Sequence, residues 1–266
     1  MLCRSRASSK NKRILTIIGN GLIANALESC VPEEILFAAG VSDSACPDEM
    51  AFDREIRLLT ETLRYCELEN RRLVYFSSAG RIYGELAHPR NEKTVCTPTT
   101  RYGVHKLECE SRIQSSNCSY LIARLPNLVG PTKNRNQLVP QLVLQALSGQ
   151  ASILVRATRD LLGVDRMKNI LLELLGNVGK RETVVVASGV SISAMEMIAE
   201  IQSILNCKVN VTPIDAGDQQ EFEIDFLRQL APKNSVFEPD YPVRLLQQFV
   251  PAIADSLRTE MSVEVR

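Results

Sequence analysis

The sequence has little of several features that mark particular classes of protein. It contains no tryptophan, two histidines and 5% aromatic residues. Basic and acidic residues number 31 each, so the formal net charge is zero. A balanced charge provides no general electrostatic attraction to nucleic acid or to an anionic membrane surface. We therefore predict that neither is a partner.

Long apolar runs are absent as well. No stretch approaches the roughly 18 consecutive apolar residues that suggest a transmembrane helix. The basic start of the chain, residues 1–13, leads directly into an apolar strand and lacks the apolar region and cleavage site of a secretory signal. We expect these residues to form a flexible tail.

Paired cysteines are also missing. The eight cysteines are scattered without a C-x-x-C pair, and His88 and His105 lie far from any metal-ligand spacing. This pattern favours free thiols in a reducing cytoplasm over disulfides or a structural metal. We predict a cytoplasmic protein with no bound metal.

What the chain does contain is typical of a globular enzyme. Its 266 residues are 45% hydrophobic and 23% charged, which suits one large domain or one and a half. Apolar runs alternate with amphipathic stretches, and this alternation predicts an α/β fold with a doubly wound parallel sheet. In the first half we expect strands at residues 14–18, 34–39, 72–76 and 120–123, and helices at residues 22–29, 51–66 and 103–114.

The second half is less regular. A capping box of Ser193 and Glu196 predicts the start of one helix. We expect other helices at 137–147, 165–175 and 242–257, and strands at 152–156, 183–187 and 208–212. The chain then divides into the tail (1–13), a Rossmann-like dinucleotide-binding domain (14–131) and a substrate-binding lobe interleaved with the last sheet strands (132–266).

A glycine-rich turn joins the first expected strand to the first expected helix. In the pattern Gly19-x-Gly21-x-x-Ala24, the first glycine permits a tight turn and the second lets the backbone approach a pyrophosphate. The small Ala24 lets the helix pack closely on the strand, and the helix N-terminus offers unpaired N–H groups to phosphate. The turn predicts dinucleotide binding.

Tyr102 and Lys106 form a candidate chemical pair. Their four-residue spacing at the start of an expected helix places both side chains on one helical face. A phenol with a pKa near 10 is a poor base at neutral pH, and a neighbouring ammonium favours the phenolate. The pair could therefore exchange a proton with a substrate hydroxyl or ketone.

Four motifs in a fixed order carry a family resemblance. They are the glycine turn, residues 74–84 (VYFSSAGRIYG), residues 102–106 (YGVHK) and residues 123–131 (ARLPNLVGP). Together they resemble the extended short-chain dehydrogenase/reductases, and most closely the NAD-dependent epimerase/dehydratase family of nucleotide-sugar enzymes. Residues 159–165 (RDLLGVD) are similar to that family's R-D-[FL]-x-x-V-D segment.

The resemblance implies roles for individual residues. Tyr102 would be the catalytic acid/base, Lys106 its activator and a ribose contact, and Ser78 the hydroxyl that binds the reacting sugar oxygen. A nucleotide-sugar substrate would contact Ser78, Asn127 and Arg159. NAD or NADP would be held by Gly19, Asn20, Gly21, Leu22, Ile23, Ala39, Lys106 and Pro126.

Two departures from the family pattern affect the expected chemistry. The family's active hydroxyl lies four residues before the position of Tyr83, and Ala79 stands there, so the hydroxyl either comes from Ser78 or Ser77 or is missing. Dehydratases of the family carry an Asp-Glu pair directly after that hydroxyl, whereas this chain has Gly80 and Arg81. The second departure argues against dehydration.

A third departure is a short N-terminal half. Phe37 comes sixteen residues after Gly21, so a strand–helix–strand segment is missing. In the family this segment supplies an acidic contact to the adenosine ribose; Asp43 could substitute, or it could be an ordinary loop residue. We expect fewer strands on the adenosine side. If strand 34–39 pairs beside the first strand, right-handed crossovers would put helix 22–29 on the opposite sheet face from usual.

These features predict an NAD(P)-dependent oxidoreductase or epimerase acting on a nucleotide-linked sugar, with reduction of a keto-sugar favoured. The alternative is a non-catalytic dinucleotide- or sugar-nucleotide-binding protein on the same fold. By resemblance we also expect a homodimer through helices 51–66 and 103–114, the first of which carries the apolar stripe Phe52, Ile56, Leu59 and Leu63. We expect His105 to face solvent.

Overall fold

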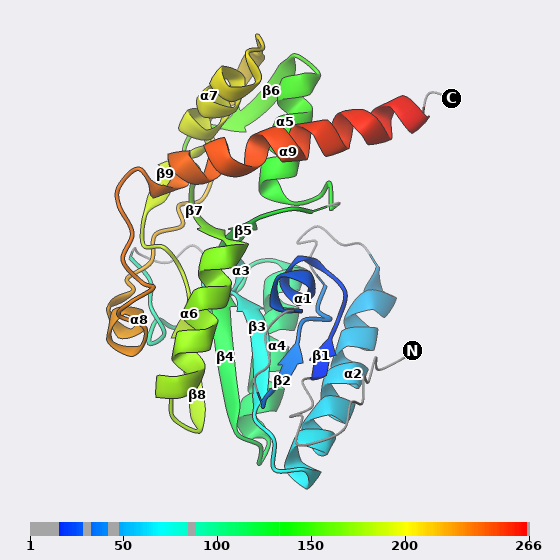
Figure 1. The fold of residues 1–266 in the computed structure, drawn as a ribbon, viewed down its shortest axis with the longest axis vertical. Coiled ribbons are helices and arrows are strands. Elements are labelled where there is room, and N and C mark those ends of the chain that lie inside the picture. The colour runs from blue at the N-terminus through cyan, green and yellow to red at the C-terminus, as the bar shows by residue number, and fades with distance from the viewer. Residues whose placement is uncertain (1–15, 29–32, 42–47, 85–88, 133, 265–266) are drawn as a thin grey trace.

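The structure of the protein is a computed structural model that describes residues 16–28, 33–41, 48–84, 89–132 and 134–264. The predicted tail, Asp43 and His88 lie outside these ranges. Five parallel strands form the central sheet in the order β1-β2-β3-β4-β8 (Figure 1). Their bounds are Thr16–Ile18 (β1), Ile35–Phe37 (β2), Leu73–Ser78 (β3), Tyr120–Leu125 (β4) and Arg181–Val185 (β8).

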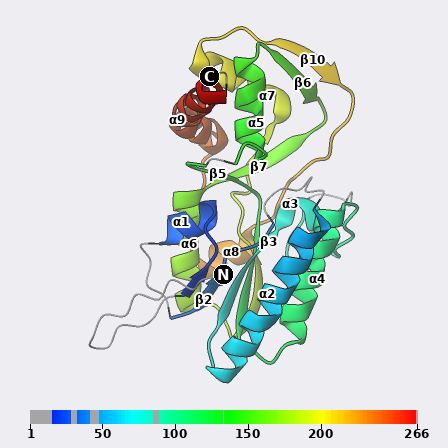
Figure 2. The same cartoon turned by 90° about the vertical axis from the view of Figure 1, so that its right-hand side faces the viewer.

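Helices cover both faces of this sheet, and Figure 2 shows the sheet between them. Helices α2 (Glu49–Leu68) and α4 (Arg101–Ser115) lie on one face. Helix α1 (Leu22–Leu27) packs against α6 (Val164–Asn177) on the other face. The strands are mostly apolar because both faces are covered. The predicted doubly wound α/β fold is therefore confirmed.

The crossover from β1 to β2 has an unusual hand. Residues 19–34 join these neighbouring strands through α1, on the sheet face away from α2 and α4. The β2–α2–β3 crossover moves in the same direction along the sheet but on the opposite face, so the two connections have opposite hands. With the strands pointing up in Figure 1, the β1–α1–β2 crossover is left-handed. About 98% of such crossovers are right-handed, so this connection is an exception, and the change of sheet face that a right-handed crossover would have required does not follow.

Packing explains why α1 stays on this face. Leu27 is fully buried in one hydrophobic cluster with Met167 and Ile170 of α6. Strand β2 meanwhile is fixed between β1 and β3 by parallel pairing on both sides. The short connection therefore lets β2 pair within the sheet while the apolar face of α1 packs on α6. These two arrangements together give the left-handed crossover. Within the described residues only β1 and β2 precede Ala39, as the short N-terminal half predicts.

A second layer of structure forms the C-terminal lobe. Strands β5 (Asn127–Val129), β7 (Thr158–Gly163) and β9 (Ser191–Ser193) make one small sheet, and β6 (Gln150–Leu154) pairs with β10 (Asn210–Ile214) in another. Helices α5 (Leu138–Leu147), α7 (Ala194–Leu205) and α9 (Tyr241–Glu264) share a separate apolar core over them. Figure 1 shows α9 lying across this lobe. Two short helices, α3 (Ala79–Ile82) and α8 (Asp225–Leu230), complete the chain.

The lobe contains one confirmed detail and several missed elements. The capping box is present, because the Ser193 hydroxyl accepts from the Glu196 N–H and the Glu196 carboxylate accepts from the Ser193 N–H. Strand β7 was not expected, since its Arg159 and Asp160 are charged. Both side chains are nevertheless buried. No helix in the described part of the chain is long and apolar enough to cross a membrane.

The apolar stripe that supported the expected dimer interface is buried within the subunit. The α2 stripe faces its own sheet: Leu59 and Leu63 are buried in a cluster with residues of β2 and β3, and Ile56 packs beside them. A stripe buried within one subunit cannot also cover a partner. The homodimer stays a prediction, and any interface on α2 must use the other side of the helix.

The two glycines of the first turn should differ in their effect on stability. Gly19 has φ +132°, and a Cβ there would collide with the Ala38 carbonyl, so Gly19→Ala should cost about 2 kcal/mol or more of the free energy of unfolding. A Cβ on Gly21 meets no atom within 4 Å, so Gly21→Ala should change it by less than about 0.5 kcal/mol. Urea denaturation of the two variants measures both; equal costs would contradict this account of the turn.

Candidate active site

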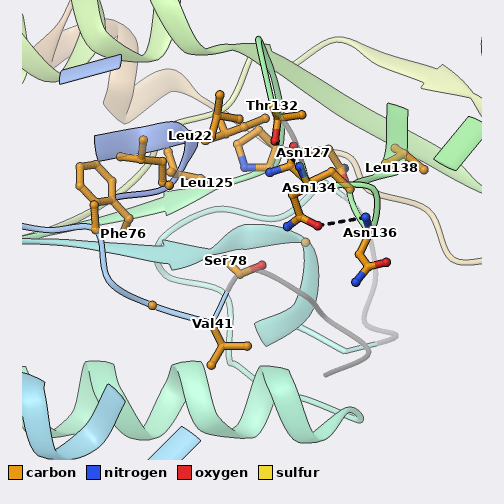
Figure 3. A pocket seen from close by; sticks show the side chains of 18 of the residues that line it. Leu22, Val41, Phe76, Ser78, Leu125, Asn127, Thr132, Asn134, Asn136 and Leu138 are labelled. Atoms are coloured by element: carbon orange, nitrogen blue, oxygen red, sulfur yellow. Dashed lines mark hydrogen bonds between the residues drawn. The ribbon is translucent and has the colours of Figure 1, made fainter. Parts of the chain in front are cut away.

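A cleft of about 880 Å³ lies between the carboxyl ends of the sheet strands and the C-terminal lobe. Every site residue proposed from the sequence lines it: Gly19, Asn20, Gly21, Leu22, Ile23, Ala39, Ser78, Tyr102, Lys106, Pro126, Asn127 and Arg159. Figure 3 shows Leu22, Val41, Ser78, Asn127 and Leu138 around this space. Residues that are up to 140 positions apart in the sequence thus meet at one site, while their individual roles stay predictions.

The glycine turn forms one wall of the cleft. Gly19 lets the chain after β1 press against Ala38 at the end of β2, where the Ala38 N–H donates to the Ile18 carbonyl at 2.7 Å. Gly21 is the N-cap of α1 and provides no side-chain cap for the first turn. The open space at Gly21 and the uncapped N–H groups of α1 together suit a phosphate group. This end of the cleft therefore fits the pyrophosphate of a dinucleotide.

Tyr102 and Lys106 lie on the first turns of α4, which begins after a Thr100 cap. The Thr100 hydroxyl accepts from the Gly103 N–H at 3.1 Å and so fixes the start of the helix. The Lys106 ammonium lies 5.7 Å from the centre of the Tyr102 ring. Burial raises the pKa of Tyr102 above the ordinary phenol value, although the Lys106 charge and the nearby Ser78 hydroxyl oppose the rise. The phenol is therefore protonated at neutral pH.

The two serines at the end of β3 have different surroundings. Ser78 lines the cleft together with Tyr102, and its nearby hydroxyl lowers the pKa of the Tyr102 phenol. The Ser77 hydroxyl is buried, lines the cleft, and has no hydrogen-bond partner within the described residues. Ala79, at the family's hydroxyl position, is fully buried at the start of α3. Ser78 is thus the serine placed to act with Tyr102.

The largest surprise is a buried carboxylate beneath the Tyr–Lys pair. Glu55 of α2 is 3% exposed, and its oxygens accept from Lys106 Nζ at 2.9 Å, the Tyr75 hydroxyl at 2.9 Å and the Val41 N–H at 2.7 Å. His105 Nε2 lies 2.9 Å from the same carboxylate. Burial alone would raise the pKa of Glu55, but the Lys106 charge and these hydrogen bonds outweigh it and hold the pKa below its usual range.

This network also changes the surroundings of Lys106. The lysine is 2% exposed, and although burial disfavours its charge, the Glu55 carboxylate raises its pKa above the usual value. Its ammonium also donates to the Tyr75 hydroxyl at 3.2 Å. Gly40 allows this arrangement, because a Cβ there would come within 2.5 Å of Lys106 Nζ and 2.8 Å of Glu55 Oε1. Lys106 therefore reaches the cleft already paired with a negative charge.

The expected position of His105 is wrong, and the same network gives the reason. His105 is 6% exposed and packs its ring 4.7 Å from the Phe52 ring while bonding Glu55. Its position between Tyr102 and Lys106 had suggested a solvent-facing side chain. One signal could have indicated Glu55: an acidic residue on the buried side of the α2 stripe, one position before Ile56, needs a cationic partner.

Glu55, His105 and Cys109 bring a carboxylate, an imidazole and a thiol within 4.8 Å of one another. Such a set resembles a metal site, but its chemistry does not fit one. The Lys106 ammonium already provides the cation beside Glu55. Burial raises the pKa of the Cys109 thiol to about 12, so the thiol on its own is protonated at neutral pH.

The lobe side of the cleft contains a second polar network. The Asn127 amide donates to the Gln220 side-chain oxygen at 2.8 Å and to the Asp160 carbonyl at 3.2 Å. Gln220 in turn donates to the Gly80 carbonyl at 3.2 Å. Arg159 forms an ion pair with Asp218 at 2.8 Å, which neutralises part of its charge. Gln220, which the motifs did not indicate, thus connects the lobe to helix α3, directly after β3.

Comparison with known proteins identifies the family of this chain and several solved structures with a similar fold. The model of the NAD dependent epimerase/dehydratase family matches residues 4–187. The chain is similar to UDP-N-acetylglucosamine 4-epimerase from Methanobrevibacter ruminantium, solved in complex with UDP-N-acetylmuramic acid, with 19% identity and a TM-score of 0.71 over 82% of this chain and 75% of that one. A comparison with curated proteins found no match.

Two further structures have the same fold. One is the UDP-glucose 4-epimerase of Thermus thermophilus in complex with NAD, at 18% identity and a TM-score of 0.68, covering 86% of this chain and 81% of that one. The other is RMD from Pseudomonas aeruginosa complexed with NADPH, at 18% identity and a TM-score of 0.69, covering 87% and 83%. At these identities the likeness establishes the fold.

The Glu55–Lys106 pair should show strong coupling in a double-mutant cycle. Glu55→Gln leaves the buried Lys106 charge without compensation, and Lys106→Met does the same to Glu55, so each should cost about 3–5 kcal/mol of stability. The double variant should cost clearly less than the sum, because it buries no unpaired charge. Chemical denaturation at pH 7 measures the cycle, with Arg112→Met of the exposed Glu108 pair as a control expected near zero. Additive costs would mean that the two charges are not coupled.

Proposed function

The chain belongs to the NAD dependent epimerase/dehydratase family, and on this premise we propose that it is an NAD(P)-dependent oxidoreductase acting on a nucleotide-linked sugar, most simply by reducing a keto-sugar. One observation carries the proposal: Tyr102, with the Ser78 hydroxyl nearby and the Lys106 charge beside its ring, lines the same cleft as the glycine turn. A proton donor and a pyrophosphate cradle in one cleft suit a hydride-transfer enzyme.

The cofactor-binding residues divide into two groups. Gly19, Gly21 and the first turn of α1 would hold the pyrophosphate, with Asn20, Leu22 and Ile23 beside them. At the other end of the cleft, Lys106 and Pro126 would contact the ribose and the nicotinamide, near Ala39. The bound nicotinamide would supply the hydride. The family and the NAD and NADPH complexes of similar structures support this choice of cofactor.

The substrate would lie on the lobe side of the cleft. Asn127, fixed by Gln220, and Arg159, fixed by Asp218, provide an amide and a guanidinium for the phosphates or sugar hydroxyls. Similar structures have been solved with UDP-N-acetylmuramic acid and with UDP-glucose, which supports a nucleotide sugar. Ser78 would hydrogen-bond the reacting sugar oxygen while Tyr102 moves the proton.

The electrostatics of the site favour reduction over epimerisation. In reduction Tyr102 donates its proton to a carbonyl oxygen as that oxygen gains negative charge, and this step needs a neutral phenol. The raised pKa of Tyr102 keeps the phenol neutral, and Glu55 offsets the Lys106 charge that would otherwise favour the phenolate. An epimerase begins by removing a proton, so it needs the phenolate. Gly80 and Arg81, in place of the Asp-Glu pair, also argue against dehydration.

Two observations favour the alternative of a non-catalytic binding protein. Ala79 replaces the family's hydroxyl, and Lys106 is paired within the protein before any ligand arrives. On this alternative the cleft would bind a dinucleotide or sugar nucleotide without turning it over. The position of the Ser78 hydroxyl, near enough to lower the pKa of Tyr102, favours the enzyme, because binding alone does not require a hydroxyl near a phenol.

Tyr102→Phe should separate the enzyme from the binding protein. The substitution removes one hydroxyl and adds no bulk, so cofactor binding and stability should stay near wild type while turnover falls by about 10²–10⁴. Ser78→Ala should fall between wild type and Tyr102→Phe, and Ser77→Ala should be milder because Ser77 does not contact the phenol. Steady-state rates with a panel of nucleotide-linked keto-sugars and NADH or NADPH measure this, with nucleotide binding as the control for folding. Full activity in Tyr102→Phe would show that Tyr102 is not the catalytic acid/base.

The pH dependence of the two reaction directions should differ. Because the pKa of Tyr102 lies above 10, the neutral phenol needed for reduction is present throughout pH 6–9, and the reductive kcat should stay flat there and fall only at higher pH. The oxidative kcat needs the phenolate and should rise with pH across the same range. Rates measured in both directions between pH 6 and 10 test this. A reductive rate that already declines before the pH reaches 8 would show that the pKa of the phenol is lowered, not raised.

A further inference from the structure

The strand order of the sheet limits which part of a dinucleotide the cleft can hold. In a doubly wound sheet a dinucleotide lies across the crevice where the strand order reverses, and each side of the reversal supplies one mononucleotide half-site. Here the described strands run β1-β2-β3-β4-β8 with no reversal, and β1 is the edge strand. All strands that could support a ligand therefore lie on one side of the glycine turn.

The crevice itself is retained. Such a crevice opens between two neighbouring strands when the chain after one strand leaves toward one face of the sheet and the chain after the other leaves toward the opposite face. In most doubly wound sheets this happens only where the strand order reverses. The left-handed β1–α1–β2 crossover has the same effect, since α1 lies on one face and α2 on the other. The space over Gly21, in which a Cβ would meet no atom within 4 Å, lies in this crevice. The glycine turn therefore keeps its space for a pyrophosphate, although the described strands support only one mononucleotide half-site.

The surviving half is the one that contains the chemistry. Ser77, Ser78 and Pro126 line the cleft at the ends of β3 and β4, beside Tyr102 and Lys106 of α4. The Ser77 hydroxyl is buried and without a hydrogen-bond partner in the described residues, so a polar group of a ligand would satisfy it. This half has polar groups in place for the nicotinamide and its ribose.

On the adenosine side, the end of β2 provides no such group among the residues that the structure describes, and Asp43 lies outside them. In dinucleotide-binding folds the side chain that contacts the adenosine ribose lies about 20 residues after the glycine turn, at the end of the next strand. Here that strand is β2, and it ends in Ala38, Ala39 and Gly40, which carry no charge. Gly40 lies against Lys106 and Glu55, so the end of β2 belongs to the reacting side of the cleft.

Resting on the proposed function, we propose that the cleft recognises its cofactor through the nicotinamide ribose phosphate and leaves the adenosine end without specific contacts. The enzyme then cannot distinguish the 2′-hydroxyl of NAD from the 2′-phosphate of NADP. It also binds the bare mononucleotide about as well as either dinucleotide.

Titration of the purified full chain with three reduced nucleotides tests the proposal. NADH, NADPH and reduced nicotinamide mononucleotide share the same fluorescent ring, and the protein has no tryptophan to interfere. Their dissociation constants should agree within about 5-fold, whereas losing two or three adenosine hydrogen bonds would cost ~100-fold or more. ADP-ribose, which has no nicotinamide, should compete poorly. Gly21→Ala should weaken all three reduced nucleotides by a similar factor, since they share the phosphate beside this residue.

The outcomes separate this proposal from the proposed function. If NADH binds ~100-fold more tightly than the mononucleotide, if NADH and NADPH differ by that factor, or if ADP-ribose competes as well as NADH, the adenosine end is recognised and the proposal is overturned. The proposed function would then stand. If none of the three reduced nucleotides binds, both fail.

Discussion

The carboxylate of Glu55 is the interaction on which the candidate site depends. It joins four parts of the chain, because α2 carries it and its partners come from the loop after β2, from β3 and from α4. A charge buried to this depth is tolerated only when its oxygens are fully occupied, and those of Glu55 accept from a backbone N–H, a phenol and an ammonium. The position of Lys106, and through it the electrostatics at Tyr102, therefore follows from the packing of α2 on the sheet.

The same carboxylate connects fold to chemistry. Without it, the Lys106 ammonium would be the dominant charge beside the Tyr102 ring, at 5.7 Å, and would favour the phenolate. With it, the pair is close to neutral and burial decides the protonation of the phenol.

The sequence predicted those features that depend on local pattern. Apolar runs gave β1, β2, β3 and β4 to within a few residues, and the motifs gathered residues that all line one cleft. It did not predict Glu55 or Gln220, because each acts through contacts more than 50 residues away along the chain: Glu55 with Lys106, and Gln220 with Asn127. Strand β7 was not predicted because its charged residues suggest an exposed segment. In the structure these charges have partners: Arg159 is paired with Asp218, and Asp160 accepts from the Ser188 and Gly189 N–H groups.

The left-handed crossover is an exception to the rule that strand–helix–strand crossovers are right-handed, and it keeps the crevice at Gly21 open. Handedness rules describe isolated strand–helix–strand units, in which strand twist and helix packing favour one hand. The six-residue α1 is too short to cover the sheet alone, and its Leu27 gains its burial from the cluster shared with α6. A right-handed connection would have moved α1 to the face of α2 and closed the crevice above Gly21. Packing against α6 therefore keeps the phosphate site at the glycine turn open in a sheet whose described strands end at β1.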